Sequence, residues 1–383
     1  MFFGLFLPAV YAQQAETLHF KRIEGLSQST GYSITKDKQG FLWIATGNGL
    51  NRYDGIEMKV YKPSLEPGKG QMQGRVIRSR LLEDEKGQIW FSTDLAVHEF
   101  NKREEAFNKH DLITGDKQNE TEKFANPIIK LGDHLWLANA TDGIFDLNTE
   151  TKEITSYPLT EKDEKGNLIQ LMYHGIYDDN AKFWFATNKG LLSFDLTTKK
   201  WQRFLKGGSF YSISYSKDTI YASEGKDVVW FHKTTFHYGN NVFVDNTEFS
   251  RGLIRCLYTD VKQNTWMGDE IGNVYCKAAG NMVFRWVGNI NGNIKPKSHY
   301  PVYCFYADGN TLWAGAYTLG LLKSELDQQQ FKSYPQEGSN ANEIFVNSIY
   351  ETSPNEILIG SFENGIMVLD KKNNTATELK LPY

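Results

Sequence analysis

Cysteine is scarce in this sequence, and the few cysteines present are not arranged as metal ligands. The chain has three in 383 residues, at Cys256, Cys276 and Cys304. They form no C-x-x-C pair and have no histidine at metal-ligand spacing, so the sequence predicts no metal site and no cofactor. At most one disulfide could form in an exported chain, and we interpret all three as small buried apolar side chains.

An excess of positive charge is also lacking. The chain carries 42 lysines and arginines against 46 aspartates and glutamates, a formal net charge of -4. This balance leaves no basic surface for nucleic acid or for an anionic membrane. Beyond the N-terminus, no apolar run approaches the roughly 18 residues that a membrane helix needs. We therefore expect no nucleic acid among the partners, and contact with a membrane only through a part of the protein that this chain lacks.

The N-terminus carries an apolar run with the pattern of a signal peptide. Residues 1–12 end in Val10-Tyr11-Ala12, with small residues where a signal peptidase cleaves, and polar Gln13 follows. The pattern predicts export. The run lacks the usual basic segment, which favours a start further upstream, and a buried first strand is the alternative interpretation.

Long stretches with a 3.6-residue apolar period are absent, and strand-forming residues take their place. The 33 glycines accompany 24 phenylalanines, 20 tyrosines and 9 tryptophans. This balance is typical of strands joined by tight turns. The sequence therefore predicts an all-β protein.

One pattern recurs eight times along the chain, each time around a large apolar anchor residue. The eight anchors are Trp43, Trp90, Trp136, Trp184, Tyr221, Trp266, Trp313 and Leu358. Their successive separations are 47, 46, 48, 37, 45, 47 and 45 residues. An apolar strand and a turn such as Asp37-Lys38-Gln39-Gly40 precede each anchor strand, and two further strands follow it. Four short antiparallel strands in about 45 residues are the content of one propeller blade.

The repeats predict a β-propeller over residues 18–383. Residues 18–23 have the character of a fourth strand without its own first three, as expected if the N-terminus completes the last blade. Two organisations are consistent with eight repeats: seven blades followed by the start of a second propeller, or one ring of eight blades. The anchor aromatics are interpreted as core side chains between neighbouring blades.

The glycine-rich segment Gly47-Asn48-Gly49 has two interpretations, a phosphate-binding loop or a hairpin turn. A dinucleotide-binding fingerprint requires a helix after the glycines, whereas here residues 50–53 continue as another strand. We therefore interpret it as the hairpin turn between the second and third strands of a blade.

Residues 20–55 carry a family resemblance. The segments "GLS", "GFLWIAT" and "GLNRYDG" resemble the first repeat of the two-component regulator propeller family, and the later repeats fit the pattern more loosely. The resemblance implies the periplasmic sensor region of an inner-membrane receptor, commonly a hybrid histidine kinase and sometimes a diguanylate cyclase. Similar proteins often sense oligosaccharides and carry two successive seven-bladed propellers. We therefore expect this chain to be a fragment of a longer receptor that forms a homodimer.

The loops that enter the innermost strand of each blade predict a ligand site at one mouth of the central channel. Arginines with aromatic residues there suit an anionic sugar, because the guanidinium pairs with carboxylate or sulfate and the rings stack on the sugar face. The residues placed near that mouth are Arg75, Arg78, Asn126, Tyr173, His174, Arg251, His299, Tyr300 and Glu343.

Two other functions stay open. A propeller-type polysaccharide lyase could use His174, His299 or Tyr300 as a base. A glycosidase would need facing carboxylates, but the acidic pairs Asp178-Asp179 and Asp269-Glu270 fall at turns, which explains them without catalysis. We therefore predict no catalytic residue and no enzymatic activity for this chain. A protein-interaction propeller is the third possibility, and it would expose an apolar patch on one face.

Overall fold

The computed structural model describes residues 17–64, 70–112, 125–178, 180–245, 250–292, 299–326, 346–362, 365–371, 373 and 375–379. The chain divides into two compact units, Met1–Leu326 and Asp327–Tyr383. The described residues contain strands and turns, and none of them belongs to a helix able to cross a membrane. The predicted signal peptide, residues 1–12, lies outside the described residues.

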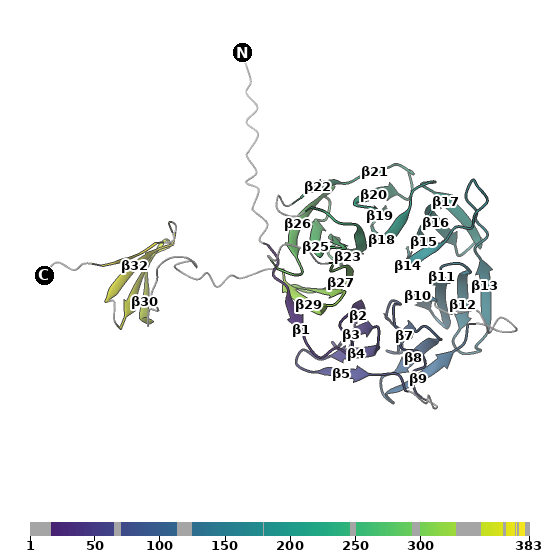
Figure 1. The fold of residues 1–383 in the computed structure, drawn as a ribbon, viewed down its shortest axis with the longest axis horizontal. Coiled ribbons are helices and arrows are strands. Elements are labelled where there is room, and N and C mark those ends of the chain that lie inside the picture. Colours follow the sequence, from purple (N-terminus) through teal and green to yellow (C-terminus); the bar gives the residue numbers. More distant parts are fainter. Residues whose placement is uncertain are drawn as a thin grey trace, which may run out of the picture. The chain divides into compact units, whose positions relative to one another are not determined.

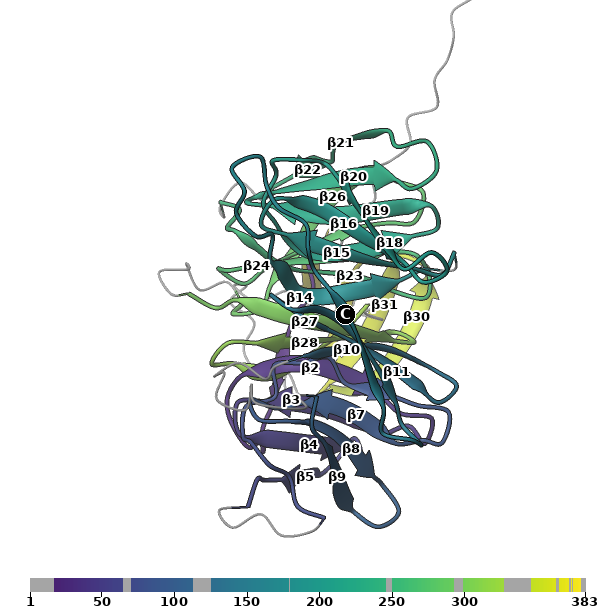
Figure 2. The same cartoon turned by 90° about the vertical axis from the view of Figure 1, so that its right-hand side faces the viewer.

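The described part of the first unit consists of seven sheets that are arranged in a ring, in the manner of propeller blades (Figure 1). The first three sheets are β2 (Gly31–Lys36), β3 (Leu42–Thr46), β4 (Gly49–Tyr53) and β5 (Met58–Tyr61); β6 (Leu82–Glu83), β7 (Ile89–Ser92), β8 (Val97–Asn101) and β9 (Ala106–His110); and β10 (Asn126–Leu131), β11 (His134–Asn139), β12 (Gly143–Asn148) and β13 (Ile154–Pro158). The next two are β14 (Leu171–Tyr177), β15 (Lys182–Thr187), β16 (Gly190–Asp195) and β17 (Lys200–Phe204); and β18 (Phe210–Ser216), β19 (Thr219–Glu224), β20 (Asp227–His232) and β21 (Tyr238–Asn240). The last two are β23 (Ile254–Thr259), β24 (Thr265–Asp269), β25 (Asn273–Lys277) and β26 (Val283–Asn289) with β22 (Val242–Val244); and β27 (Val302–Asp308), β28 (Thr311–Ala316) and β29 (Gly320–Glu325) with β1 (Lys21–Ile23). Figure 2 shows these strands from the side.

The last of these sheets joins the two ends of the first unit. β1 pairs antiparallel with β29, with Arg22 opposite Leu322 and Ile23 opposite Leu321 (Figure 1). The prediction that an N-terminal fourth strand completes a later blade is therefore confirmed for residues 21–23, and the blade is the seventh. Because β2 follows β1 and packs against β27 and β28, the pairing fastens the first sheet to the last.

The anchors form the core between neighbouring sheets. Trp43 is fully buried with Ile89 and Phe100 of the following sheet, and Trp184 is buried with Ile220 of its own following sheet. The other five anchors of the first unit lie in corresponding apolar clusters. The interpretation of the anchors as core side chains is confirmed for the first unit.

A hydrogen bond between a turn carboxylate and an indole recurs in four sheets. Asp37 Oδ2 accepts from Trp43 Nε1 at 2.8 Å, while its Oδ1 accepts from the backbone N–H groups of Gln39 and Phe41. The corresponding bonds join Asp84 to Trp90 at 2.9 Å, Asp178 to Trp184 at 2.8 Å and Asp260 to Trp266 at 3.0 Å. The carboxylate thus fixes the turn and the anchor together.

The glycine-rich segment is a hairpin turn, as predicted. Thr46 pairs with Gly49 at the end of the β3–β4 ladder. Gly49 has a φ of 114°, and a Cβ there would lie 2.4 Å from the carbonyl oxygen of Tyr61. Only glycine fits this backbone and this approach. The segment therefore serves the fold rather than a phosphate.

The eighth repeat forms a sheet of its own in the second unit. It comprises β30 (Val346–Ser353), β31 (Glu356–Ser361), β32 (Ile366–Asp370) and β33 (Thr375–Glu378), paired antiparallel in that order. The anchor Leu358 lies in β31, opposite Tyr350.

Candidate functional site

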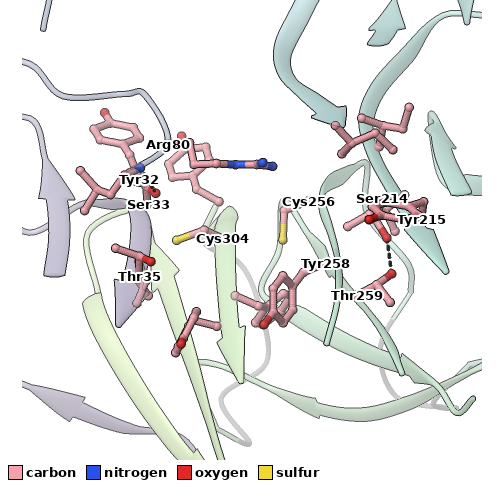
Figure 3. Close-up of a pocket in the computed structure, with 18 residues that line it drawn as sticks. Tyr32, Ser33, Thr35, Arg80, Ser214, Tyr215, Cys256, Tyr258, Thr259 and Cys304 are labelled. Carbon is pink, nitrogen blue, oxygen red and sulfur yellow. Dashed lines mark hydrogen bonds between the residues drawn. The ribbon is translucent and has the colours of Figure 1, made fainter. Parts of the chain in front are cut away.

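The inner strands of the first unit enclose a cavity of about 320 Å³ (Figure 3). Its walls come from β2, β14, β18, β23 and β27, together with residues 80 and 81 just before β6. Hydroxyl groups are frequent in these walls, among them those of Ser33, Thr35 and Tyr258. A space of this size is at the lower end of the range of small-molecule sites.

A group of tyrosines and arginines surrounds the start of these inner strands. The rings of Tyr32 and Tyr303 lie 5.3 Å apart at 31°, and the Arg78 guanidinium lies 5.8 Å from the Tyr32 ring. The Arg255 guanidinium lies 5.3 Å from the Tyr211 ring and interacts electrostatically with Tyr303. We refer to these five residues as the mouth cluster. Half-buried rings beside guanidinium groups can stack on a flat polar ligand and pair with its negative charge.

Four of the five residues of the mouth cluster, all except Arg78, share one position in the repeat. Each inner strand has one residue that pairs directly with the anchor, such as Thr35 with Trp43. Three residues before that partner lie Tyr32, Ser79, Asn126, Tyr173, Tyr211, Arg255 and Tyr303. Aromatic and polar residues therefore occupy this position in every sheet of the first unit. Counting from the anchors in the sequence could have identified the position.

Arg80 lines the cavity together with Tyr32 and Tyr303, is less exposed than Arg78, and was not predicted. Its side chain is half-buried and points into the cavity among Cys304, Cys256 and Tyr258 (Figure 3). Burial lowers the pKa of its guanidinium, while the neighbouring Tyr258 phenol favours the charged form.

The residues predicted for the mouth lie in different places in the structure. Arg78 joins the mouth cluster, whereas Arg75 is exposed and its backbone N–H donates to Asp94 Oδ1 at 2.8 Å. Asn126 is buried, and its Oδ1 has no hydrogen-bond partner among the described residues. Arg251 forms ion pairs with Asp245 at 2.8 Å and Asp227 at 3.2 Å.

The remaining predicted residues lie elsewhere or outside the described part. His299 is exposed, and Tyr300 packs against the apolar cluster around Trp266. Tyr173 and His174 belong to β14 by their backbone, but their side chains are outside the described residues, as is all of Glu343. Of the predicted set, the described side chains therefore place only Arg78 in the mouth cluster.

The acidic pairs serve turns and ion pairs. Asp269 accepts hydrogen bonds from the backbone N–H groups of Gly252, Ile271 and Asn273, and burial raises its pKa. Glu270 pairs with Arg255 at 3.1 Å. Asp179 is outside the described residues. None of the described residues that line the cavity carries a carboxylate.

The cysteines are free thiols, and the interpretation as buried side chains holds fully for Cys256 alone. Cys256 is buried beside Trp266, and Cys276 and Cys304 are partly buried. Within the described ranges, no group of three histidine, cysteine, aspartate or glutamate side chains is placed to hold a metal ion.

The fold is shared with domains of known structure. The extracellular domain assigned to the hybrid two component system BT3049 from B. thetaiotaomicron has a TM-score of 0.67 and 19% identity, covering 95% of this chain and 49% of that one. That of BT4673, from the same organism, has a TM-score of 0.62 and 17% identity over 92% and 45%. A catalytically inactive virginiamycin B lyase from Staphylococcus aureus has a TM-score of 0.61 and 14% identity over 80% and 99%.

Sequence similarity is confined to a short segment. Histidine kinase P4 of Formosa agariphila is 47% identical over 47 residues, which are 12% of this chain and 3% of that protein. No family model matches the chain. The chain also spans only about half the length of the two-component extracellular domains. It has a β-propeller fold, which it shares with these extracellular domains.

Proposed function

We propose that this chain is part of the exported sensor region of a membrane signalling receptor of the two-component type, and that its first unit binds the ligand. The mouth cluster, two of whose tyrosines also line the cavity, is the observation that supports a binding role most directly. The shared fold with extracellular domains of hybrid two-component systems and the short similarity to a histidine kinase support the receptor context. In a receptor dimer, the ligand would shift the balance between two arrangements by its difference in affinity for them.

The proposed ligand is an oligosaccharide. Paired tyrosine rings offer faces for stacking on a sugar ring, and the neighbouring guanidinium groups pair with acidic substituents. Tyr32 and Tyr303 provide such a pair across neighbouring inner strands, and Arg78 and Arg255 provide the charges.

We further propose that the seven sheets of the first unit close one propeller and that the second unit begins another. The pairing of β1 with β29 supports this organisation, because it completes the seventh sheet without using the eighth repeat. The division into two units is in line with it. The export that this function needs would depend on the signal peptide at residues 1–12.

The first test is a thermal-shift screen of the purified chain against neutral and acidic oligosaccharides. A ligand present at about 100 times its dissociation constant should add roughly 2.7 kcal/mol to the stability of the unit that binds it. A sugar that raises the unfolding temperature and is recovered unchanged supports a sensor. A sugar that is consumed would identify an enzyme instead, and silence from every sugar contradicts the oligosaccharide proposal.

Loss of the tyrosine pair is expected to weaken binding of any sugar found in that screen. Replacing Tyr32 and Tyr303 together by alanine should lower the affinity about 100-fold, because each stacked ring contributes roughly tenfold. Isothermal titration calorimetry measures the change. The control is Tyr238→Ala, which removes an exposed tyrosine from β21 and should leave the affinity unchanged. Equal affinities for the double variant and the control would remove the tyrosine pair from the site.

A further inference from the structure

Among the described residues that line the cavity, Arg80 provides the only formal charge. Within the described part of the chain, no carboxylate lies within ion-pair distance of its guanidinium, and it makes no hydrogen bond to another residue. Its one electrostatic neighbour is the phenol of Tyr258. The cavity therefore holds a positive charge that the protein itself does not neutralise.

The groups around Arg80 stay neutral at physiological pH. Burial raises the pKa of Tyr258 and of Cys304 to about 12. Burial also raises the pKa values of Tyr303, Tyr306 and Cys256. No phenolate or thiolate is thus available there as a counter-ion.

Three other half-buried cations near the inner strands have carboxylate partners. Lys36 pairs with Asp308 at 2.5 Å, and Lys233 pairs with Asp178 at 3.3 Å. In the mouth cluster, Arg255 pairs with Glu270. A half-buried cation without a partner costs free energy. Unlike these three cations, Arg80 has no carboxylate partner among the described residues. A structural ion pair therefore does not account for its charge.

The repeat leaves space beside Arg80. Its position lies two residues before the strand partner of the anchor. The corresponding residues of the other sheets are Ser33, Pro127, His174, Ser212, Cys256 and Cys304. Three of these small side chains, Ser33, Cys256 and Cys304, line the same cavity. One long cationic side chain therefore enters a ring of mostly small ones.

We propose that the cavity is a binding site for a compact oxyanion, a carboxylate, sulfate or phosphate group, which pairs with Arg80. The planar guanidinium presents two parallel N–H groups that match the oxygens of such an anion. Hydroxyl groups of Ser33 and Thr35 line the same space and can donate to a further oxygen. The volume of about 320 Å³ admits a small acid, or one acidic group of a larger molecule that enters from the mouth. The site does not depend on the ligand being a sugar.

The test is calorimetric titration of the purified chain at pH 7.5 with sodium sulfate, sodium phosphate and sodium glucuronate, at constant ionic strength set by sodium chloride. Saturable binding of at least one of them in the millimolar range or below is expected. The variant Arg80→Gln should weaken this binding at least 30-fold, and Arg80→Lys, which keeps the charge but not the fork, should weaken it less. Sulfate also stabilises proteins without specific binding, so the comparison between variants is decisive.

The matched control is Arg285→Gln, which removes the same charge from an exposed position of β26. It should bind as the unmodified chain does. Arg80 makes no ion pair in the described structure, so its replacement should not unfold the protein, and a thermal unfolding scan of each variant checks this. If Arg80→Gln does not fold, the Arg80→Lys variant and the titration of the unmodified chain still decide the outcome.

The source of the anion is decided by a second set of titrations. Binding of the free ions assigns the site to a small acid, whereas binding only of acidic oligosaccharides, again dependent on Arg80, assigns it to a group on a larger ligand. Equal responses of the unmodified chain and Arg80→Gln to every oxyanion, or no saturable response at all, would overturn the proposal. Because sulfate has no face for stacking, alanine at Tyr32 and Tyr303 should leave its binding nearly unchanged. A failure of sugar sensing is thereby distinguishable from a failure of the anion site.

Discussion

Replacing Asp178 by alanine is expected to lower the free energy of unfolding of the first unit by about 3–5 kcal/mol. Asp178 Oδ2 accepts a hydrogen bond from Trp184 Nε1 at 2.8 Å and pairs with Lys233 Nζ at 3.3 Å. The side chains of Asp178 and Lys233 are 1% and 6% exposed. The variant would leave Lys233 buried without its counter-ion and would leave the indole N–H without its acceptor, and both changes are costly.

Urea denaturation followed by tryptophan fluorescence measures this loss. The control is Asp54→Ala, because Asp54 also accepts hydrogen bonds from two turn N–H groups, those of Ile56 and Glu57, but is exposed and binds no indole. Its replacement should cost much less. A loss no larger for Asp178→Ala than for Asp54→Ala would contradict the structural role of Asp178. It would also reopen the interpretation of Asp178 as a functional carboxylate.

The repeat made most of the fold predictable. The anchor spacing located the second strand of each sheet, and the turn Asp37-Lys38-Gln39-Gly40 marked the end of the strand before it. The bond between Asp37 and Trp43 was not predicted, although the residues are six apart in four of the repeats. The bond forms because the chain reverses between β2 and β3, which brings the anchor indole back to the carboxylate. The reversal is seen in the register of β2 on β3 and could not be read from the sequence.

The site was harder to predict, because the inner strands are irregular. Six of the seven inner strand pairs contain a register shift near their start, as between Gly31 and Ser33. A bulge of this kind changes which side chains face the channel, so alternation of residues does not identify them. Alignment on the aspartate before each anchor selected Arg251 and His299, which precede Arg255 and Tyr303 of the mouth cluster by four residues each.

Arg80 escaped prediction for a related reason. The inner strand of its sheet, β6, is only two residues long, and Arg80 precedes it. Without a regular strand, the alternation of side chains between the two faces of a sheet cannot be used. The sequence therefore does not distinguish Arg78, at the mouth, from Arg80, in the cavity. The distinction required the three-dimensional position of neighbouring sheets, because the cavity walls come from residues as far apart in sequence as Tyr32 and Tyr306.

The first unit is expected to lose stability as the pH falls from about 6.5 toward about 3, and His98 is the principal cause above the carboxylate range. The His98 ring is fully buried between Phe91 and Phe107, and its Nε2 accepts a hydrogen bond from the Gln73 N–H at 2.8 Å. Its Nδ1 has no hydrogen-bond partner among the described residues. Burial, assisted by the charges of His110 and Lys109, lowers the pKa of His98 from 6.5 to about 3.

The direction of the effect follows from proton binding. Below pH 6.5 the unfolded chain binds a proton at His98, whereas the folded chain binds that proton only when the pH falls to about 3. The unfolded state is therefore favoured as the pH falls through this range, by roughly 1.4 kcal/mol for each pH unit. Between pH 6.5 and pH 5, the loss from His98 should be about 2 kcal/mol.

The measurement is urea denaturation of the unmodified chain, His98→Gln and His237→Gln at pH 6.5 and at pH 5. Glutamine can accept the Gln73 N–H but does not titrate, so His98→Gln should lose about 2 kcal/mol less than the unmodified chain over this interval. His237→Gln removes an exposed imidazole from the turn before β21 and should keep the pH dependence of the unmodified chain. Identical pH dependence of all three proteins would show that His98 is accessible to protons in the folded state. The result also sets the conditions for the anion titrations. They belong above pH 6.5, where a loss of binding by Arg80→Gln cannot arise from acid unfolding of the sheet β6–β9, which contains His98 and begins directly after Arg80 and Leu81.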